Sequence, residues 1–407
     1  MSKKLLPAYL LTFVNVLGIS ILMPVLPFIV EEYGAPKWVF GLMLTLYSSF
    51  QFLGSPYLGA MSDSIGRKPV LVISQIGTLI SWFIFLFALF LPNTSLIGIS
   101  IPLIIIGFAR ALDGITGGNT SVANAYVSDI TTREEKSYIF GYLGGIAGIG
   151  MIIGPGIGGM SSAGSMGYKG TIIAAIIISI IALIAIFLWL KESLIEENKS
   201  DRQKESVLKS FLIFRRIREI NPKPIIKVLF LTKFFFSVMM AFYMGTISLY
   251  LIDLFQFDSS ELGVFMLVVG IFLSFNQAFM APRIIKKLGE FPTLLLGLGL
   301  STLGLIAITL TDNFWLYIAF YYIMNLGLSL SFPTFNGLIS IHADPKKQGA
   351  VMGISESINS LAMAVFLTIG SALYDIIHFQ VYYIMAALPF TAFLIAYTSF
   401  KRYKAKT

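Results

Sequence analysis

Long apolar runs separated by short polar links dominate the chain. A run of about 20 apolar residues is long enough to cross the hydrocarbon core of a bilayer as a helix, and the sequence contains twelve such runs. Their approximate spans are 5–30, 38–59, 69–91, 98–127, 137–161, 170–190, 224–252, 261–281, 292–311, 315–338, 350–374 and 380–399. The pattern predicts an all-α membrane protein with twelve transmembrane helices.

One link is longer and more polar than the others. It begins with KESLIEENKSDRQKES and continues with the basic amphipathic stretch FLIFRRIREI. Six runs precede it and six follow it. We therefore expect an N-terminal six-helix bundle over 1–190, a cytoplasmic linker over 191–223 and a C-terminal six-helix bundle over 224–407.

Two loops indicate that the halves are copies of each other. Residues 58–67 read LGAMSDSIGR and residues 281–290 read APRIIKKLGE, which aligns Gly66 with Gly289. Two related halves are the arrangement in which a site at the repeat interface opens alternately to the two sides of the membrane. The sequence thus favours two pseudo-symmetric bundles.

The basic residues lie almost entirely on one side of the predicted helices. Of the 29 Lys and Arg residues, 24 fall in the N-terminal segment, in alternate links or in the C-terminal tail, and only Lys37 and Lys169 fall on the other side. Loops rich in Lys and Arg stay in the cytoplasm. We therefore expect a plasma (inner) membrane protein with both termini cytoplasmic. The net charge of +8 then reflects orientation in the bilayer, and no nucleic-acid partner is expected.

Composition removes several classes of function. The chain has 12% charged residues, whereas soluble domains have about 25%. It contains no Cys and 2 His, which excludes disulfides, zinc–thiolate sites and iron–sulfur clusters. The sequence has no GxxxxGK[ST] motif, which argues against ATP-driven transport. We expect neither an enzyme nor a metal or other cofactor.

Two charged residues lie at membrane depth in the fourth run. A charge there is costly and usually faces a cavity or a partner. Arg110 and Asp113 are spaced so that they share one face of a helix. One interpretation is a proton relay, in which Asp113 carries the coupling proton and Arg110 modulates it. The alternative is a static internal ion pair.

Four segments carry motifs: 17–27 (LGISILMPVLP), 59–68 (GAMSDSIGRK), 110–118 (RALDGITGG) and 148–159 (GIGMIIGPGIGG). With the twelve-helix pattern, they resemble the Major Facilitator Superfamily, whose members have repeated halves. The second motif is specific for that superfamily, and the fourth is typical of its drug:proton antiporters. The stretch ARALDGITGGNTSVANAYVSDIT is most similar to the tetracycline-efflux branch.

The resemblance implies a cytoplasmic gate at the 59–68 motif. A carboxylate, a glycine turn and cations can form a charge cluster that latches one arrangement of the two halves. In similar transporters the Asp faces the start of the eleventh helix, here near Gly349, and the Arg faces an acid that ends the fourth helix. The alternative is a set of solvated charges. The predicted gate residues are Gly59, Asp63, Gly66, Arg67, Lys68 and Asp129.

The fifth run is rich in glycine and contains a proline. Small residues let helices approach closely, and proline bends a helix. Close packing explains most of these glycines, and the resemblance implies in addition that a bent, tightly packed helix seals the cavity against leakage. The residues assigned to this antiporter motif are Gly150, Gly154, Pro155, Gly158 and Gly159.

One position departs from the efflux pattern. Tetracycline exporters and their relatives commonly carry an acid three residues before the glycine of the first helix, where this chain has Asn15. An amide carries no proton at physiological pH, so the coupling proton is expected on Asp113, with Glu356 as a further candidate. Asp253 is expected to be an interfacial charge, and Lys233 is expected to extend to the cytoplasmic surface.

Aromatic and methionine side chains predict an adaptable apolar wall with few hydrogen bonds. Such a wall suits amphipathic organic substrates better than sugars. The candidate cavity residues are Asn15, Phe236, Met240, Tyr243, Asn276, Gln277, Tyr322, Asn325 and Phe332.

These features favour a secondary active transporter that exports small amphipathic organic molecules or drugs in exchange for protons, by alternating access. The expected partners are the small-molecule substrate, protons and the lipid bilayer, and the chain is expected to be a monomer. A transporter of one metabolite, siderophore or sugar, working as exporter or symporter, is the alternative with the same fold. A non-transporting receptor is disfavoured because the linker leaves no room for a soluble signalling domain.

Overall fold

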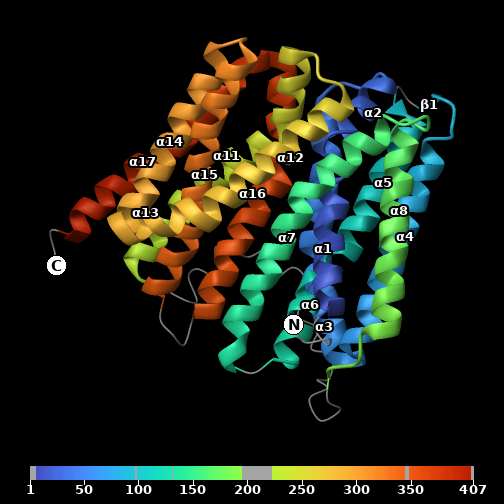
Figure 1. Ribbon diagram of the computed structural model, residues 1–407, viewed down its shortest axis with the longest axis horizontal. Helices are drawn as coiled ribbons and strands as arrows, with labels where there is room; N and C mark the ends of the chain where they lie inside the picture. The colour runs from blue at the N-terminus through green and yellow to red at the C-terminus, as the bar shows by residue number, and fades with distance from the viewer. Residues whose placement is uncertain (1–5, 97–98, 132, 195–221, 344–347, 405–407) are drawn as a thin grey trace. The chain divides into compact units, whose positions relative to one another are not determined.

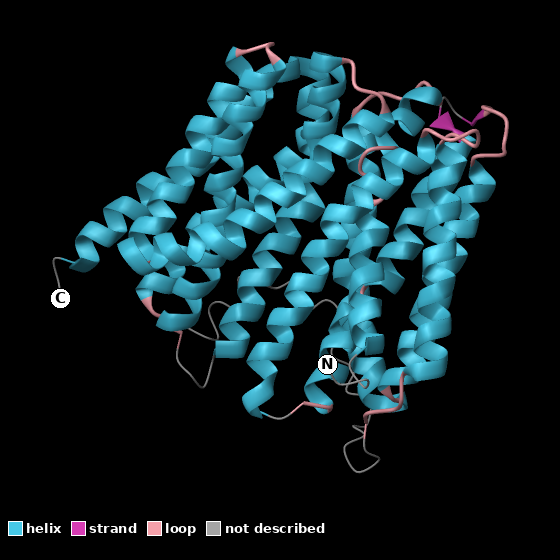
Figure 2. Cartoon of the chain, in the orientation of Figure 1, coloured by secondary structure: helices cyan, strands magenta, loops and turns pink. Residues whose placement is uncertain are grey.

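Helices make up nearly all of the chain that the structure describes (Figure 2). The computed structural model describes residues 6–96, 99–131, 133–194, 222–343 and 348–404. The helices are α1 (Leu6–Ser20), α2 (Leu26–Glu32), α3 (Trp38–Ile65), α4 (Arg67–Ala88), α5 (Ile101–Gly117), α6 (Thr120–Asp129), α7 (Arg133–Ser162), α8 (Tyr168–Trp189), α11 (Pro224–Phe255), α12 (Ser259–Phe275), α13 (Ala281–Leu288), α14 (Glu290–Ala307), α15 (Phe314–His342), α16 (Gln348–Ile377) and α17 (Val381–Lys404). A short hairpin, β1 (Ser95–Leu96) and β2 (Ile99–Ser100), links α4 to α5.

The helices account for the twelve predicted crossings. Among the described residues, 9 segments are long and apolar enough to cross a membrane. One of them, Val351–Ser399, contains both α16 and α17. The shorter pair α1 and α2 supplies one further crossing and α3 another. The expected all-α membrane fold is therefore confirmed.

Three predicted spans are interrupted, and the sequence explains where. The first breaks at residues 21–25, because Pro24 has no N–H to donate and Pro27 starts a new helix. The fourth breaks after Gly117 into α5 and α6. The eighth passes through a wide π-helical turn, Asn276–Met280, directly before α13. Such π turns are frequent at functional sites.

The chain divides into two compact units. The first comprises Met1–Ser210 with Phe257–Leu267, and the second comprises Phe211–Gln256 with Val268–Thr407. In the first unit α5 packs against α3 and α4, and α1 packs against α7. In the second unit α14 packs against α15, and α11 packs against α16 and α17 (Figure 1). The bundle boundaries proposed from the sequence stay a prediction.

Each unit buries its own core and exposes apolar side chains outward. A core cluster in the first unit includes Ala8, Leu11, Leu58, Val70, Leu71, Val122 and Ile186. The second unit buries tyrosines from four helices, and the rings of Tyr250 and Tyr382 lie 4.7 Å apart. Large apolar side chains such as Phe187 and Leu303 are exposed, as helices surrounded by lipid require.

Candidate functional site

A charge cluster forms where α3 turns into α4. Gly66 makes the turn with a φ of 109°, in the region that favours glycine. Arg67 begins α4 and is buried; its Nη1 donates to Asp63 Oδ1 at 2.5 Å and to Ser62 Oγ at 2.6 Å. Its Nε donates to Asp129 Oδ2 at 3.0 Å, at the end of α6. The structure thus brings together the acids and the arginine that the sequence singles out as a gate.

The other predicted gate residues have smaller roles in this geometry. Lys68 donates its Nζ to the carbonyl of Phe187 at 3.0 Å. A Cβ at Gly59 would meet Ser121 Oγ at 3.6 Å, an ordinary contact, so space alone does not demand glycine there. The segment near Gly349 belongs to the other compact unit. Its proposed contact with Asp63 stays a prediction.

Glu192, just after α8, completes the cluster and was missed by the sequence analysis. Its carboxylate accepts from the backbone N–H groups of Arg67 and Lys68 at 2.9 and 3.0 Å, which caps the N-terminus of α4. A Cβ at Gly66 would lie 2.5 Å from Glu192 Oε2, so the carboxylate would have to shift to admit a side chain there. Ser193 Oγ donates to Asp129 Oδ2 at 3.0 Å. The available signal was an acid directly after the sixth apolar run.

Two effects act on the pKa of Glu192. Partial burial raises the pKa of its carboxyl, but hydrogen bonds from the backbone N–H groups of Leu194, Arg67, Lys68 and Ser193 outweigh burial and bring the pKa below its ordinary value. A carboxyl with a lowered folded pKa stabilises the fold above its unfolded pKa. That contribution is lost as pH falls through the folded pKa.

Glu192→Ala is therefore expected to destabilise the protein in a pH-dependent way. Near neutral pH we expect a loss of about 1–2 kcal/mol, the usual range for a lost cap with charged acceptors. The difference from wild type should shrink below about pH 4, where the wild-type carboxyl is also protonated. Thermal unfolding of the purified protein in detergent, at both pH values, measures it. An equal difference at both would contradict the cap, and Glu31→Ala, which removes an exposed acid, is the control.

Arg110 and Asp113 form a buried ion pair on α5. Both residues are nearly inaccessible, at 3% and 4% exposure. The Nη2 of Arg110 donates to Asp113 Oδ2. The guanidinium carbon also lies over the rings of Tyr47, Trp82 and Phe85, at 5.4, 5.0 and 5.9 Å from their centroids. The arginine thus keeps favourable cation–π contacts that do not depend on Asp113.

A polar chain lies near this pair in the same unit. Asn15 on α1 donates from Nδ2 to Asn119 Oδ1 at 2.6 Å. Asn119 is fully buried and donates to Ser74 Oγ at 2.6 Å, and Ser74 donates to the carbonyl of Thr116 at 2.7 Å. Thr116 follows Asp113 by three residues on α5. Asn15 therefore occupies a hydrogen-bonded position between helices.

The glycines of α7 lie on two faces of the helix and pack against different neighbours. On one face Gly150, Gly154 and Gly158 meet the backbone or side chains of residues 13–21, and a Cβ at Gly158 would overlap the carbonyl oxygen of Ile21. On another face Gly159 lies against the α12 segment of the same unit, where a Cβ would approach the Ser259 carbonyl at 2.6 Å. Pro155 lies inside the helix between them. Tight packing accounts for the spacing of the motif.

Lys233 on α11 corrects an expectation. The prediction that it extends to the membrane surface is wrong, because the residue is 7% exposed and points into the second unit. Its Nζ donates to Ser355 Oγ at 2.6 Å, and to Asn336 Oδ1 and Glu356 Oε1 at 3.2 Å each. The Glu356 side chain is 62% exposed. The second unit thus has its own buried cation with an accessible acid, because acceptors from α15 and α16 make burial of the ammonium possible.

The predicted cavity residues of the second unit fall into three groups. Phe236 and Phe332 pack edge to face at 5.2 Å, and Met240 lies one helical turn after Phe236 on α11. Tyr243 shares a hydroxyl–hydroxyl hydrogen bond with Tyr321. Asn276, at the π turn, accepts from Tyr322 Oη at 2.9 Å and donates to Asn325 Oδ1 at 3.4 Å, whereas Gln277 is exposed.

The comparisons with known proteins identify the family. The sequence profile of the Major Facilitator Superfamily matches residues 8–367. The chain belongs to this superfamily.

Individual relatives of this superfamily member are distant but cover nearly its whole length. The chain is 28% identical to the tetracycline resistance protein, class B, of Escherichia coli over 87% of this chain and 84% of that protein. It is 22% identical to the quinolone resistance protein NorA of Staphylococcus aureus, over 92% and 91%. The crystal structure of a D-xylose–proton symporter superposes with a TM-score of 0.74 at 14% identity, covering 97% of this chain and 96% of that one, which supports the fold.

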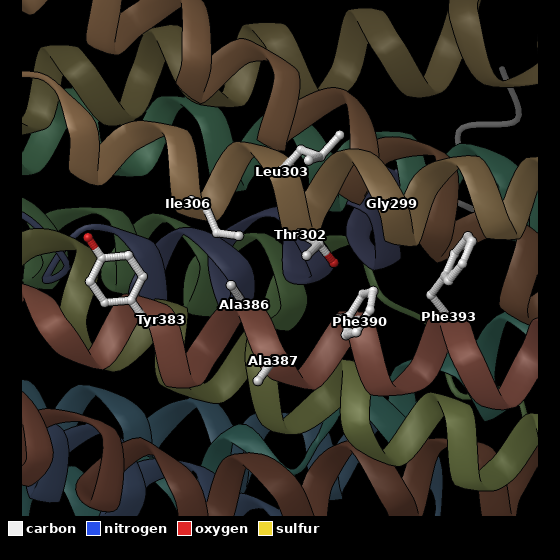
Figure 3. Close-up of a pocket in the computed structure, with 9 residues that line it drawn as sticks. All are labelled: Gly299, Thr302, Leu303, Ile306, Tyr383, Ala386, Ala387, Phe390 and Phe393. Carbon is white, nitrogen blue, oxygen red and sulfur yellow. The ribbon is translucent and has the colours of Figure 1, made fainter.

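The Major Facilitator Superfamily chain also has a groove between α14 and α17 (Figure 3). It has a volume of about 530 Å³ and is lined by Gly299, Thr302, Leu303, Ile306, Tyr383, Ala386, Ala387, Phe390 and Phe393. The Thr302 hydroxyl donates to the carbonyl of Leu298 at 2.9 Å. None of these lining residues is charged. Within the described ranges, no three His, Asp or Glu side chains are close enough to hold a metal ion.

Proposed function

We propose that this chain is a proton-coupled exporter of small amphipathic organic molecules, working by alternating access. The observation that carries the proposal is the buried Arg110–Asp113 pair in a chain whose relatives include tetracycline and quinolone resistance proteins. Protonation of Asp113 would remove its charge while Arg110 stays in contact with three aromatic rings. The pair can therefore open at modest cost, as a proton carrier requires.

The gate proposal rests on the charge cluster between α3 and α4. Arg67 holds together Asp63, at the end of α3, and Asp129, at the end of α6, and Glu192 caps α4 from the segment that follows α8. Ion pairs that join the ends of several helices can bias an interface with two arrangements. We propose that this cluster opens and closes with the transport cycle.

The distribution of basic residues supports an orientation in the membrane. We propose that both termini, the loop with Arg67 and the linker face the cytoplasm of an inner membrane, because 24 of 29 Lys and Arg residues fall on that side. We further propose that the chain works as a monomer and takes its energy from the proton gradient without a cofactor.

The test uses purified protein in liposomes loaded with an acidic buffer and a pH-sensitive dye. Tetracycline, ethidium and norfloxacin are added outside. A proton antiporter is expected to concentrate at least one of them in the lumen while the lumen becomes more alkaline. Nigericin, which collapses the pH gradient, should abolish the accumulation. The chain contains no cysteine. Single cysteines can therefore be introduced and labelled with thiol reagents to report the orientation of the protein in the same vesicles.

Two results would overturn the proposal. Movement of protons and substrate in the same direction would make the chain a symporter. Gradient-driven uptake of a sugar, organic acid or siderophore, with none of the three drugs transported, would favour the transporter of one metabolite.

A further inference from the structure

Lys233 is a buried cation whose closest contact is not its counter-ion. The shortest hydrogen bond of its ammonium, 2.6 Å, goes to the neutral hydroxyl of Ser355. The bond to the Glu356 carboxylate is 3.2 Å long, whereas charge-assisted N–H···O bonds are usually about 2.7–2.9 Å. Ser355 is fully buried, so that contact is fixed by the packing of α16 on α11.

Among the described hydrogen-bond partners of the Lys233 ammonium, Glu356 supplies the carboxylate, and its side chain is accessible. Its side chain is 62% exposed, whereas that of Lys233 is 9% exposed. An exposed carboxylate is well hydrated and loses little when it leaves a long ion pair. A buried ammonium, in contrast, needs an anion close by. The pair is therefore asymmetric, because Glu356 can leave and Lys233 cannot.

Two aromatic residues lie one helical turn from residues of this cluster. Phe236 follows Lys233 by three residues on α11, and Phe332 precedes Asn336 by four on α15, so each ring lies one turn from a residue of the cluster. The two rings contact each other at 5.2 Å. Phe236 is buried, whereas Phe332 is partly exposed, so a molecule that reaches the ammonium would meet the Phe332 ring near the cluster.

We infer that Lys233 is an anion site for the carboxylate of an aromatic organic acid, which replaces Glu356 on the ammonium. The incoming carboxylate takes the place of one that is released to water, so the charge at the buried position is unchanged. The aromatic part of the ligand packs near Phe332, which is partly exposed. This inference rests on the proposed export function, which it deepens by naming organic anions as a class of cargo.

The experiment compares three ligands that share one ring system. Binding of 2-naphthoate, 2-naphthamide and 2-naphthylmethylammonium to the full-length protein in nanodiscs is measured by calorimetry at neutral pH. Lys233→Met is expected to weaken 2-naphthoate binding by about tenfold or more, because a charge-assisted bond is lost. Glu356→Gln is expected to strengthen it by a similar factor, because the competing carboxylate is gone. Neither change should alter 2-naphthamide binding by more than about twofold.

A double variant guards against misfolding. Lys233→Met with Glu356→Gln leaves no charge at the pair, so it should fold and should bind 2-naphthoate and 2-naphthamide equally. Unchanged 2-naphthoate binding in Lys233→Met would overturn the inference, and so would wild-type protein that does not bind 2-naphthoate. Tight binding of 2-naphthylmethylammonium that Glu356→Gln abolishes would make the site a cation site instead.

The result is separable from the test of export. Binding in nanodiscs needs no gradient, whereas drug accumulation is measured in liposomes from the same preparation. Lys233-dependent binding without accumulation of any compound would keep the anion site and reject proton-coupled export. Accumulation of tetracycline together with 2-naphthoate binding that ignores Lys233 would do the reverse.

Discussion

Asp113→Asn is expected to yield a protein that exchanges substrate across the membrane but cannot concentrate it. Asparagine keeps the shape of the side chain and cannot carry a proton, so the link between proton flow and substrate flow is cut. With one coupled proton, a gradient of about one pH unit can hold a concentration ratio of about tenfold. The variant is expected to hold a ratio near one under the same gradient.

The measurement is paired, in liposomes that contain equal amounts of protein. Gradient-driven accumulation tests coupling, and exchange of labelled for unlabelled substrate without a gradient tests binding and the conformational cycle. Asp253→Asn is the matched control because it makes the same substitution at another aspartate. Asp253 lies near the end of α11 and accepts from Tyr374 Oη at 2.8 Å. That variant should keep its accumulation. Uphill transport by Asp113→Asn at the wild-type ratio would remove Asp113 from the mechanism.

The unpaired Arg110 that the variant creates has a cost of its own. Breaking a buried ion pair by removing one partner typically costs about 3–5 kcal/mol. The rings of Tyr47, Trp82 and Phe85 reduce this cost because they stay in contact with the guanidinium. If the single variant fails to reach the membrane, Arg110→Met with Asp113→Asn removes both charges. That double variant should also lack accumulation if Asp113 is the carrier.

The sequence predicts most of this fold because the bilayer allows few solutions. Backbone polar groups in hydrocarbon must bond within their own segment, so a long apolar run predicts a helix almost by itself. The twelve runs therefore correspond to helices, and the loop motif brings Asp63, Arg67 and Asp129 together. Breaks within helices were not predicted, because Pro24 and the pair Gly117–Gly118 lie inside runs of otherwise continuous hydropathy.

What the sequence could not supply was the partner of each polar group. Lys233 looked like a residue close enough to a helix end to reach water, but acceptors more than 100 positions away, Asn336 and Ser355, surround its ammonium. Glu192 looked like part of a charged linker, yet it caps α4 across a separation of 125 residues. Hydropathy predicts whether a residue lies in lipid or in water. It does not predict which helices are neighbours, and the contacts of Lys233 and Glu192 depend on that.

Gly158→Ala is expected to disable the protein, whereas Gly148→Ala, ten residues earlier on α7, is expected to be harmless. A Cβ at Gly158 would overlap the carbonyl oxygen of Ile21, which belongs to backbone and cannot rotate away. A Cβ at Gly148 meets nothing within 4 Å among the described residues. Both changes gain the same helix propensity, about 1 kcal/mol, so the difference between them isolates the packing of α7 against residues 13–21.

The expected cost of the overlap at Gly158 is that of an overpacked core, about 1–3 kcal/mol. The overlap falls on a helix–helix contact that Gly150, Gly154 and Gly158 make on successive turns of α7. Thermal unfolding in detergent should therefore show Gly158→Ala below wild type and Gly148→Ala at or above it. Drug accumulation in liposomes should follow the same order. Equal stability and equal transport in the two variants would mean that α1 and α7 do not need this close approach. The glycine spacing would then have to be explained by something other than helix packing.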